Sequence, residues 1–269
     1  MTQVTDQVKS STMIMFEEEV VERRLNFKPD PEINNLCLGY LDEVRIEFRE
    51  SPRILEDGTE NTWEYAGLKV PSLILTFKQA RSNTNPKDRY YTHVFKPVTT
   101  VTKDGSAVEL KTVVNILQQE YARLRHIANQ YKGLKNYPVD LGSCPGIDPA
   151  ASPSTRCEQY AAFFKYFQTL LTGVNADAPM YKNVKLWIKL VADFSTRKFL
   201  AFPTYVGRGF VERVVEGMAP TIDFEPNETV QLAKGAEKKG NHETAATAPV
   251  STGDTAPSAE IQSILDKYR

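Results

Sequence analysis

Alternating apolar and polar positions predict three long strands in the first hundred residues. In the stretch 36–49 the apolar and charged side chains fall on opposite sides, namely Leu36, Leu38, Tyr40, Val44, Ile46 and Phe48 against Glu43, Arg45, Glu47 and Arg49. Gly39 inside this stretch permits a bend or a bulge, which suits a small barrel better than a flat sheet. Residues 69–98 contain two more alternating stretches and are expected to form an antiparallel hairpin with a polar, basic tip.

The periodicity becomes helical in the middle of the chain, where residues 105–175 are expected to form a helical insertion. Apolar residues recur every three or four positions between about 107 and 132, at Leu110, Val114, Leu117, Tyr121, Leu124, Ala128 and Tyr131. A second helix is expected to begin at Thr155, which forms a capping-box pattern with Glu158, and to end before Gly173.

The stretch "VKLWIKLVADFSTRKFLAFP", residues 184–203, predicts a closing hairpin. Its first strand alternates Val184, Leu186, Ile188 and Leu190, expected to point inward, with Lys185, Trp187 and Lys189, expected to point outward. Its returning strand carries Arg197, Lys198 and Phe199. Two lysines around a tryptophan on the side away from the core favour a surface for a flat, negatively charged ligand.

The two ends of the chain differ from this central part. Residues 1–35 are polar and are expected to form an N-terminal arm, and 226–256 lack large apolar residues and are expected to be a flexible linker. In 257–269, one helical face carries four apolar or aromatic residues that are candidates for binding a protein partner: Ile261, Ile264, Leu265 and Tyr268.

The net charge of −1 conceals an uneven distribution of charge. Residues 61–223 hold 21 Lys and Arg against 13 Asp and Glu, an excess of 8 positive charges, whereas both ends are acidic. Such an excess is compatible with a nucleic-acid partner, although chance surface variation also produces it.

The sequence contains few signs of catalysis. Cys37, Cys144 and Cys157 lack the spacing of a zinc site, and the chain has no phosphate-binding loop, dinucleotide fingerprint or hydrolase motif. We therefore expect a protein that is not an enzyme and that needs no cofactor or metal. No run of apolar residues is long enough to span a membrane, and we expect a cytoplasmic protein.

Aromatic and basic residues on strands are what a binder of single-stranded nucleic acid requires, because bases stack on rings and phosphates attract cations. The candidate stacking residues are Trp187, Phe199 or Phe194, Tyr91 and Tyr90. The candidate phosphate partners are Lys185, Lys189, Arg197, Lys198, Arg208, Arg89, Lys96 and Lys78. In the competing interpretation, helices cover Trp187 and Phe199 and the lysine stems only pack beside them.

The bent first strand, the hairpin, the helical insertion and the closing "VKLWIKLVADFSTRKFLAFP" hairpin together resemble OB-fold single-stranded DNA-binding proteins, in particular the divergent phage type. The resemblance implies a mainly β, α+β fold, with an OB-like antiparallel barrel over 36–225 and a flexible C-terminal tail. It also implies sequence-tolerant binding of single-stranded DNA, or of RNA, in replication, recombination or repair, with the tail recruiting proteins of those processes. The tail departs from the family because it ends "DKYR" rather than in an acidic tip.

The leading alternative is a viral structural or assembly protein that uses the same surfaces for protein contacts, and a third possibility is an enzyme or inhibitor whose site has no recognisable motif. In an assembly protein the basic face meets protein or solvent, and the terminal helix is an interface. Either function would operate in the cytoplasm, that of the host cell for a viral protein, and either is compatible with an oligomer.

Overall fold

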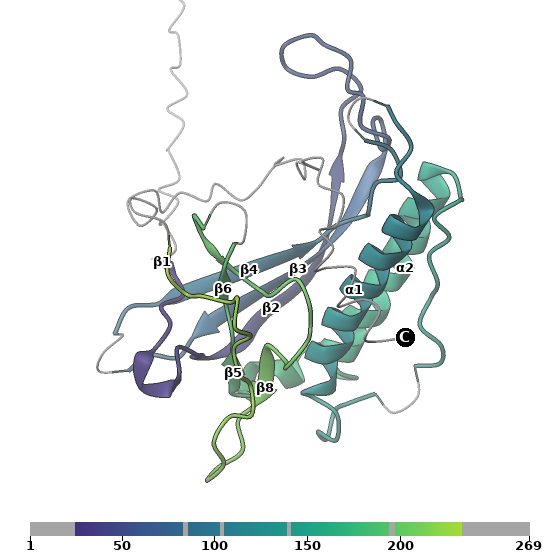
Figure 1. Cartoon of the computed structure of the whole chain (residues 1–269). Helices are drawn as coiled ribbons and strands as arrows, with labels where there is room; N and C mark the ends of the chain where they lie inside the picture. Colours follow the sequence, from purple (N-terminus) through teal and green to yellow (C-terminus); the bar gives the residue numbers. More distant parts are fainter. Residues whose placement is uncertain (1–24, 83–85, 103–104, 139–140, 194–196, 233–269) are drawn as a thin grey trace, which may run out of the picture.

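The computed structural model describes residues 25–82, 86–102, 105–138, 141–193 and 197–232, which form a curled six-stranded sheet and two long helices (Figure 1). The sheet contains β1 (Leu25–Asn26), β2 (Cys37–Glu50), β3 (Lys69–Gln79), β4 (Arg89–Phe95), β5 (Leu186–Ile188) and β8 (Val211–Arg213) in the order β1-β4-β3-β2-β5-β8. The helices are α1 (Leu110–Asn129) and α2 (Pro153–Thr172), with single turns η1 (Pro31–Ile33) and η2 (Met180–Asn183). The predicted α+β class with a helical insertion is confirmed.

The long strand β2 changes phase near its middle. Its register against β3 shifts between Leu41 and Glu43, so one extra residue, Asp42, forms a bulge. Cys37 and Leu41 are fully buried before the bulge and Val44 is buried after it, so the core side changes from odd to even positions. The prediction that Leu38 and Tyr40 share the core side with Val44 is therefore wrong. The irregularity lies at Asp42 and not at Gly39. Glycine is needed at position 39 for a different reason, because a Cβ atom there would come within 2.7 Å of the carbonyl oxygen of Lys78.

The main core lies between one face of the sheet and the two helices. The sheet contributes fully buried side chains such as Leu75, Phe77 and Ile188, and the helices contribute Leu124 and Phe164. In Figure 1 the two helices lie side by side on the same side of the sheet. We call the opposite side of the sheet the outer face.

Helix α2 begins earlier than the capping-box pattern predicts. Ser152 is the N-cap, with its hydroxyl accepting a hydrogen bond from the backbone N–H of Thr155 at 3.2 Å, and Pro153 occupies the first turn. Thr155 therefore lies inside the helix, because proline is well tolerated at the first helical position.

The closing segment is less regular than a simple hairpin. β5 pairs with β2 and β8, whereas the returning residues pair only in a separate small sheet formed by β6 (Val191–Ala192) and β7 (Leu200–Ala201). The predicted closing hairpin is therefore reduced to β6 and β7, and Arg197, Lys198 and Phe199 precede β7 instead of lying in a long returning strand.

The predicted end segments are only partly described. In the predicted arm, 25–35 form β1 and η1, and β1 pairs in parallel with β4. In the predicted linker, 226–232 are described, and the carbonyl of Thr229 accepts a hydrogen bond from Ala192 N at 2.6 Å. Residues 1–24, 233–256 and the terminal segment 257–269, with its four candidate partner-binding residues, lie outside the described residues.

Candidate nucleic-acid interface

Trp187 lies on the outer face of the sheet. Its neighbours Leu186 and Ile188 are fully buried on the helix side, so the alternation of β5 places the half-buried indole on the opposite side. In the register, Trp187 stands between Leu38 of β2 and Glu212 of β8. The helices therefore do not cover this tryptophan.

A second row of outer-face residues lies beside Trp187. Tyr40 of β2, Lys78 of β3 and Tyr90 of β4 are direct register partners, and Tyr40 follows Leu38 by two positions on the same side of β2. All three side chains are half-buried, and Lys78 Nζ lies 5.5 Å from the centre of the Tyr90 ring. Sequence reasoning missed Tyr40, because only the bulge at Asp42 reveals its side.

The cation in this row, Lys78, is already paired with an acid. Lys78 Nζ lies 3.2 Å from Asp88, which also forms a bidentate pair with Arg81 at 2.7 and 2.8 Å. These hydrogen bonds, that of Arg81 first, lower the pKa of Asp88 to about 2. A phosphate would have to compete with this carboxylate for Lys78 and Arg81.

Lys185 and Arg197 are the exposed cations of the predicted set that form no ion pair within the described residues. Lys185 precedes β5 on the Trp187 side, and Arg197 lies in the connection between β6 and β7 with a positive φ of 50°. Lys198 is exposed beside it, and Phe199 is half-buried.

Lys189 was predicted to be exposed, and this is wrong. Only 1% of its surface is exposed, and its ammonium donates to Glu228 Oε2 and to the carbonyl of Asp223, both at 2.9 Å. The residues that follow β8 pass over this end of β5, and they can be followed running past β6 in Figure 1. Lys189 therefore holds the residues that follow β8 and is not available to a ligand.

Tyr91 was proposed as a stacking residue, but it lies on the helix side. It pairs with the fully buried Phe77, its ring lies 4.8 Å from that of Phe202, and its hydroxyl accepts a hydrogen bond from Phe202 N at 3.0 Å. Its hydroxyl also lies 3.0 Å from His93 Nδ1. Tyr91 therefore links β4 to the closing segment, and its neighbour Tyr90 occupies the outer face.

The remaining predicted cations are dispersed. Arg208 pairs with Asp223 at 3.0 Å and Glu225 at 3.5 Å, and Arg89 donates to the carbonyl of Asn26 at 2.8 Å. Lys96 is exposed just after β4, where burial of its stem and the nearby Arg49 lower its pKa. These three residues do not join the group around Trp187.

Metal-ligating residues, two cysteines and His93 are candidates for carrying chemistry within the described residues. No group of three or more His, Cys, Asp or Glu that could hold a metal occurs among them. Burial raises the pKa of Cys37 to about 12 and that of Cys144 to about 11, so both thiols stay protonated near neutral pH. Burial, with a smaller effect of Arg123, lowers the pKa of His93 to about 3, so its imidazole stays neutral.

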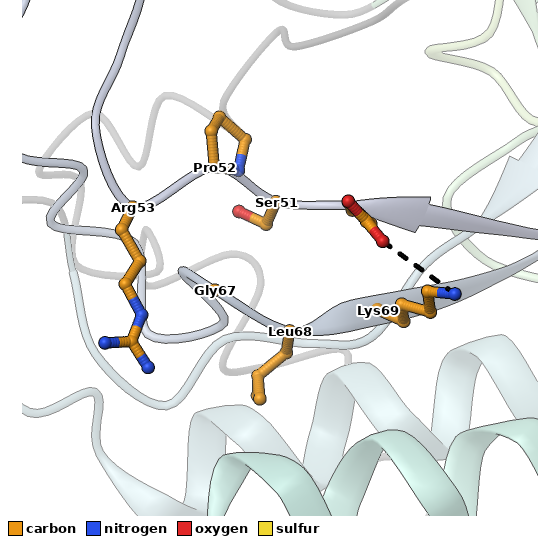
Figure 2. A pocket seen from close by; sticks show the side chains of 7 residues that line it. Ser51, Pro52, Arg53, Gly67, Leu68 and Lys69 are labelled. Carbon is orange, nitrogen blue, oxygen red and sulfur yellow. Dashed lines mark ion pairs between the residues drawn. The ribbon is translucent and has the colours of Figure 1, made fainter.

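A surface depression of about 380 Å³ lies where β2 and β3 meet the loop that joins them (Figure 2). It is lined by Glu50, Ser51, Pro52, Arg53, Gly67, Leu68 and Lys69. Figure 2 shows Lys69 directed toward Glu50, and this ion pair of 3.8 Å joins two side chains that are mostly exposed. Ser51 is the buried polar residue of this lining, and its hydroxyl already accepts a hydrogen bond from Asn61 Nδ2 at 3.2 Å.

Comparison with protein families, with curated proteins and with solved structures finds no significant match. Within the described part of the chain, no helix combines the length and the apolar character that a membrane span requires. The functional argument therefore depends on the residues of the outer face.

Proposed function

We propose that the outer face binds single-stranded nucleic acid, with DNA as the expected ligand, without sequence preference. The observation that carries this proposal is the position of Trp187, half-buried on the helix-free side of the sheet next to the Tyr40–Lys78–Tyr90 row. Diagonal neighbours on one face of a sheet lie about 7 to 8 Å apart, within reach of aromatic side chains. The aromatic side chains supply stacking surfaces, and Lys185 supplies a cation at the edge of the group.

The strand arrangement supports the OB-like part of the proposal. A long bulged strand, β2, pairs with β3 on one side and with β5 on the other, and the helices are inserted between β4 and β5. OB-fold barrels are five-stranded and partly open, and they use the face of their second and third strands to bind oligonucleotides. When the long strand β2 is counted as the first barrel strand, β3 and β4 take those two places, and they carry Lys78 and Tyr90.

The geometry refines the proposed set of ligand-binding residues. Trp187, Tyr40, Tyr90, Lys78 and Lys185 belong to it, whereas Lys189 and Tyr91 have structural roles. Arg197, Lys198 and Phe199 lie in the connection between β6 and β7. They would contact only a nucleic-acid strand that extends beyond the group around Trp187.

Salt-titrated fluorescence anisotropy tests the proposal with a labelled single-stranded oligonucleotide and a duplex of equal length. We expect a preference for the single strand and a steep loss of affinity with added salt, because bound phosphates release counterions. Trp63→Ala is the matched control for Trp187→Ala, since Trp63 lies in the β2–β3 loop, remote from the outer-face register. Equal affinity in the two variants, or a preference for duplex, would contradict the proposal.

The alternative role in assembly is favoured by a different observation, the exposed apolar side chains of the β2–β3 loop. Ile54 is 58% exposed and Leu55 is 41% exposed. A chain that binds no oligonucleotide in the titration but associates with protein would support this alternative.

A further inference from the structure

A projecting hairpin in the β2–β3 loop carries an apolar and acidic tip. We call residues 53–61 the finger; Figure 1 shows this loop extending beyond the helix ends. Ile54 forms a bridge with Glu60, and Leu55 N donates to the carbonyl of Thr59 at 2.8 Å. Asp57 accepts hydrogen bonds from the backbone N–H and the hydroxyl of Thr59, at 2.9 and 2.6 Å. The tip is therefore an ordered turn, although both of its aliphatic side chains are exposed.

The base of the finger is firmly attached to the helices. Glu64 and Arg156 form an ion pair of 2.9 Å whose side chains are only 5% and 4% exposed. Glu64 also accepts a bond from the Thr100 hydroxyl at 2.7 Å, and the buried Tyr65 donates to the carbonyl of Val98 at 2.8 Å. A finger held in this way loses little conformational entropy when its tip is bound.

A small cavity lies between the C-terminal halves of the helices, and its lining combines aromatic rings with polar groups. We call it the tyrosine groove; it is lined by Tyr121, Arg125, Ala128, Asn129, Tyr137, Tyr166, Phe167 and Leu170. Its volume of about 130 Å³ equals the space of about four water molecules, which matches the four carbon atoms of a leucine or isoleucine side chain. Arg125, the charged residue of the lining, is exposed and forms no ion pair within the described residues.

Charge and distance identify the occupant of the groove. The finger holds three acids, Glu56, Asp57 and Glu60, against one arginine, a net charge of −2. Its base is attached at Arg156 in the first turn of α2, whereas the groove uses Tyr166 to Leu170, about 15 to 21 Å further along that helix. Because the finger extends away from the helix ends, it cannot reach the groove of its own chain.

We infer that the finger of one copy docks in the tyrosine groove of a second copy, with Leu55 or Ile54 in the cavity and the acids of the turn beside Arg125. The two surfaces differ, so the contact is heterologous and extends head to tail into an open chain or a ring. A contact of this size is smaller than a standard interface, so we expect micromolar affinity. This self-association is independent of nucleic acid.

Sedimentation velocity of the full chain, up to about 100 μM, tests the inference, because a contact with a Kd near 10 μM is mostly formed there. We expect species larger than the 30.3 kDa monomer. Leu55→Asp and Arg125→Glu should each weaken association at least about tenfold, since one removes the apolar tip and the other repels it. Met218→Asp, at a position 68% exposed in the connection after β8 and outside both surfaces, should associate like the parent chain.

Mixing the two variants gives the decisive result. The Leu55→Asp chain keeps its groove and the Arg125→Glu chain keeps its finger, so an equimolar mixture should form one-to-one dimers that grow no further. Unchanged unfolding midpoints, expected because both side chains are exposed, exclude misfolding; Leu55→Ser and Arg125→Ala are the milder substitutes. A parent chain that stays monomeric, variants that still associate, or a mixture that stays monomeric would overturn the inference.

Discussion

The two faces of the sheet use the same residue types for different purposes, as the adjacent tyrosines of β4 illustrate. Tyr91 packs among rings on the helix side and bonds to the backbone of Phe202, whereas Tyr90 lies on the outer face above Lys78. One step along a strand separates a residue that holds the fold together from one that is placed to meet a ligand. Substitutions on the covered side should therefore cost stability, and those on the outer face should cost binding.

The largest expected effect concerns the buried ion pair that attaches the β2–β3 loop to the helix layer. Arg156→Ala leaves the carboxylate of Glu64 buried and without its charge partner, which should lower the free energy of unfolding by about 3 to 5 kcal/mol. Urea denaturation measures the loss. Arg49→Ala, which breaks an exposed pair with Glu47, is the control and should cost less than about 1 kcal/mol. Similar losses of stability in Arg156→Ala and Arg49→Ala would contradict the expectation that the buried ion pair matters more than the exposed one.

Lys189 sharpens the comparison because it lies on the outward side of β5 and is nevertheless buried. Lys189→Ala removes charged hydrogen bonds to Glu228 and Asp223 and should lower the free energy of unfolding by about 2 to 3 kcal/mol. Hydrogen exchange should increase in residues 221–230, which lose this attachment. Lys185→Ala, the exposed lysine of the same strand side, should change stability by less than about 0.5 kcal/mol. Equal stability of the two lysine variants would show that the packing of residues 221–230 does not depend on Lys189.

Trp187→Ala should affect binding instead of folding. Loss of one stacking surface should weaken single-strand binding by about 1 to 3 kcal/mol, a factor of about 5 to 150. Tyr91→Phe is the matched variant from the covered face: it should leave affinity unchanged and cost about 1 kcal/mol of stability through the lost bond to Phe202. Anisotropy and denaturation of the two proteins separate the roles. A binding defect in Tyr91→Phe would indicate that the covered face also contacts the ligand.

A pH dependence of stability is expected from His93 on the covered face. The pKa of His93 is about 3 in the folded chain and about 6.5 when unfolded, so below pH 6.5 the unfolded chain binds a proton that the folded chain does not. Stability should therefore fall as the pH decreases from 6.5 toward 3, by up to about 1.4 kcal/mol per pH unit. In denaturation experiments between pH 5 and 7, the free energy of unfolding of His93→Gln should depend less steeply on pH below 6.5 than that of the parent chain.

Glu120 has the opposite effect and must be compared separately. Burial raises the pKa of Glu120 to about 7, so between about pH 4.5 and 7 the folded chain keeps a proton that the unfolded chain has lost. Stability should therefore fall as the pH rises through this range. Subtracting the parent profile from that of each variant, His93→Gln and Glu120→Gln, separates the two slopes. Identical profiles for the parent and His93→Gln would mean that this histidine is solvated.

Local patterns predicted most of the secondary structure. The alternation of β3 and β4 and the helical spacing of α1 and α2 depend on nearby residues, so they can be recognised in the sequence. The same alternation correctly placed Trp187 opposite Leu186 and Ile188. A pattern divides a strand into two faces, but it does not say which face the helices cover, and so Tyr91 and Tyr90 could not be distinguished.

Contacts between distant segments determined the parts that could not be predicted. Lys189 is buried by residues 34 and 39 positions later, in a stretch whose composition indicated no packing partner. The finger is ordered by Glu64 and Arg156, which are 92 positions apart, so its sequence alone suggests an ordinary polar loop. The proposed binding group thus keeps Trp187 and Lys185, loses Lys189 and gains Tyr40.

The extra residue at Asp42 has a consequence for anyone who alters this strand. If all 14 residues of β2 are assumed to alternate without interruption, the residues before Asp42 are assigned to the wrong face of the sheet. An engineer who wishes to add a ring beside Trp187 should count even positions before Asp42 and odd positions after it. One surplus residue thereby allows a single strand to present Tyr40 outward and still bury Leu41 and Val44.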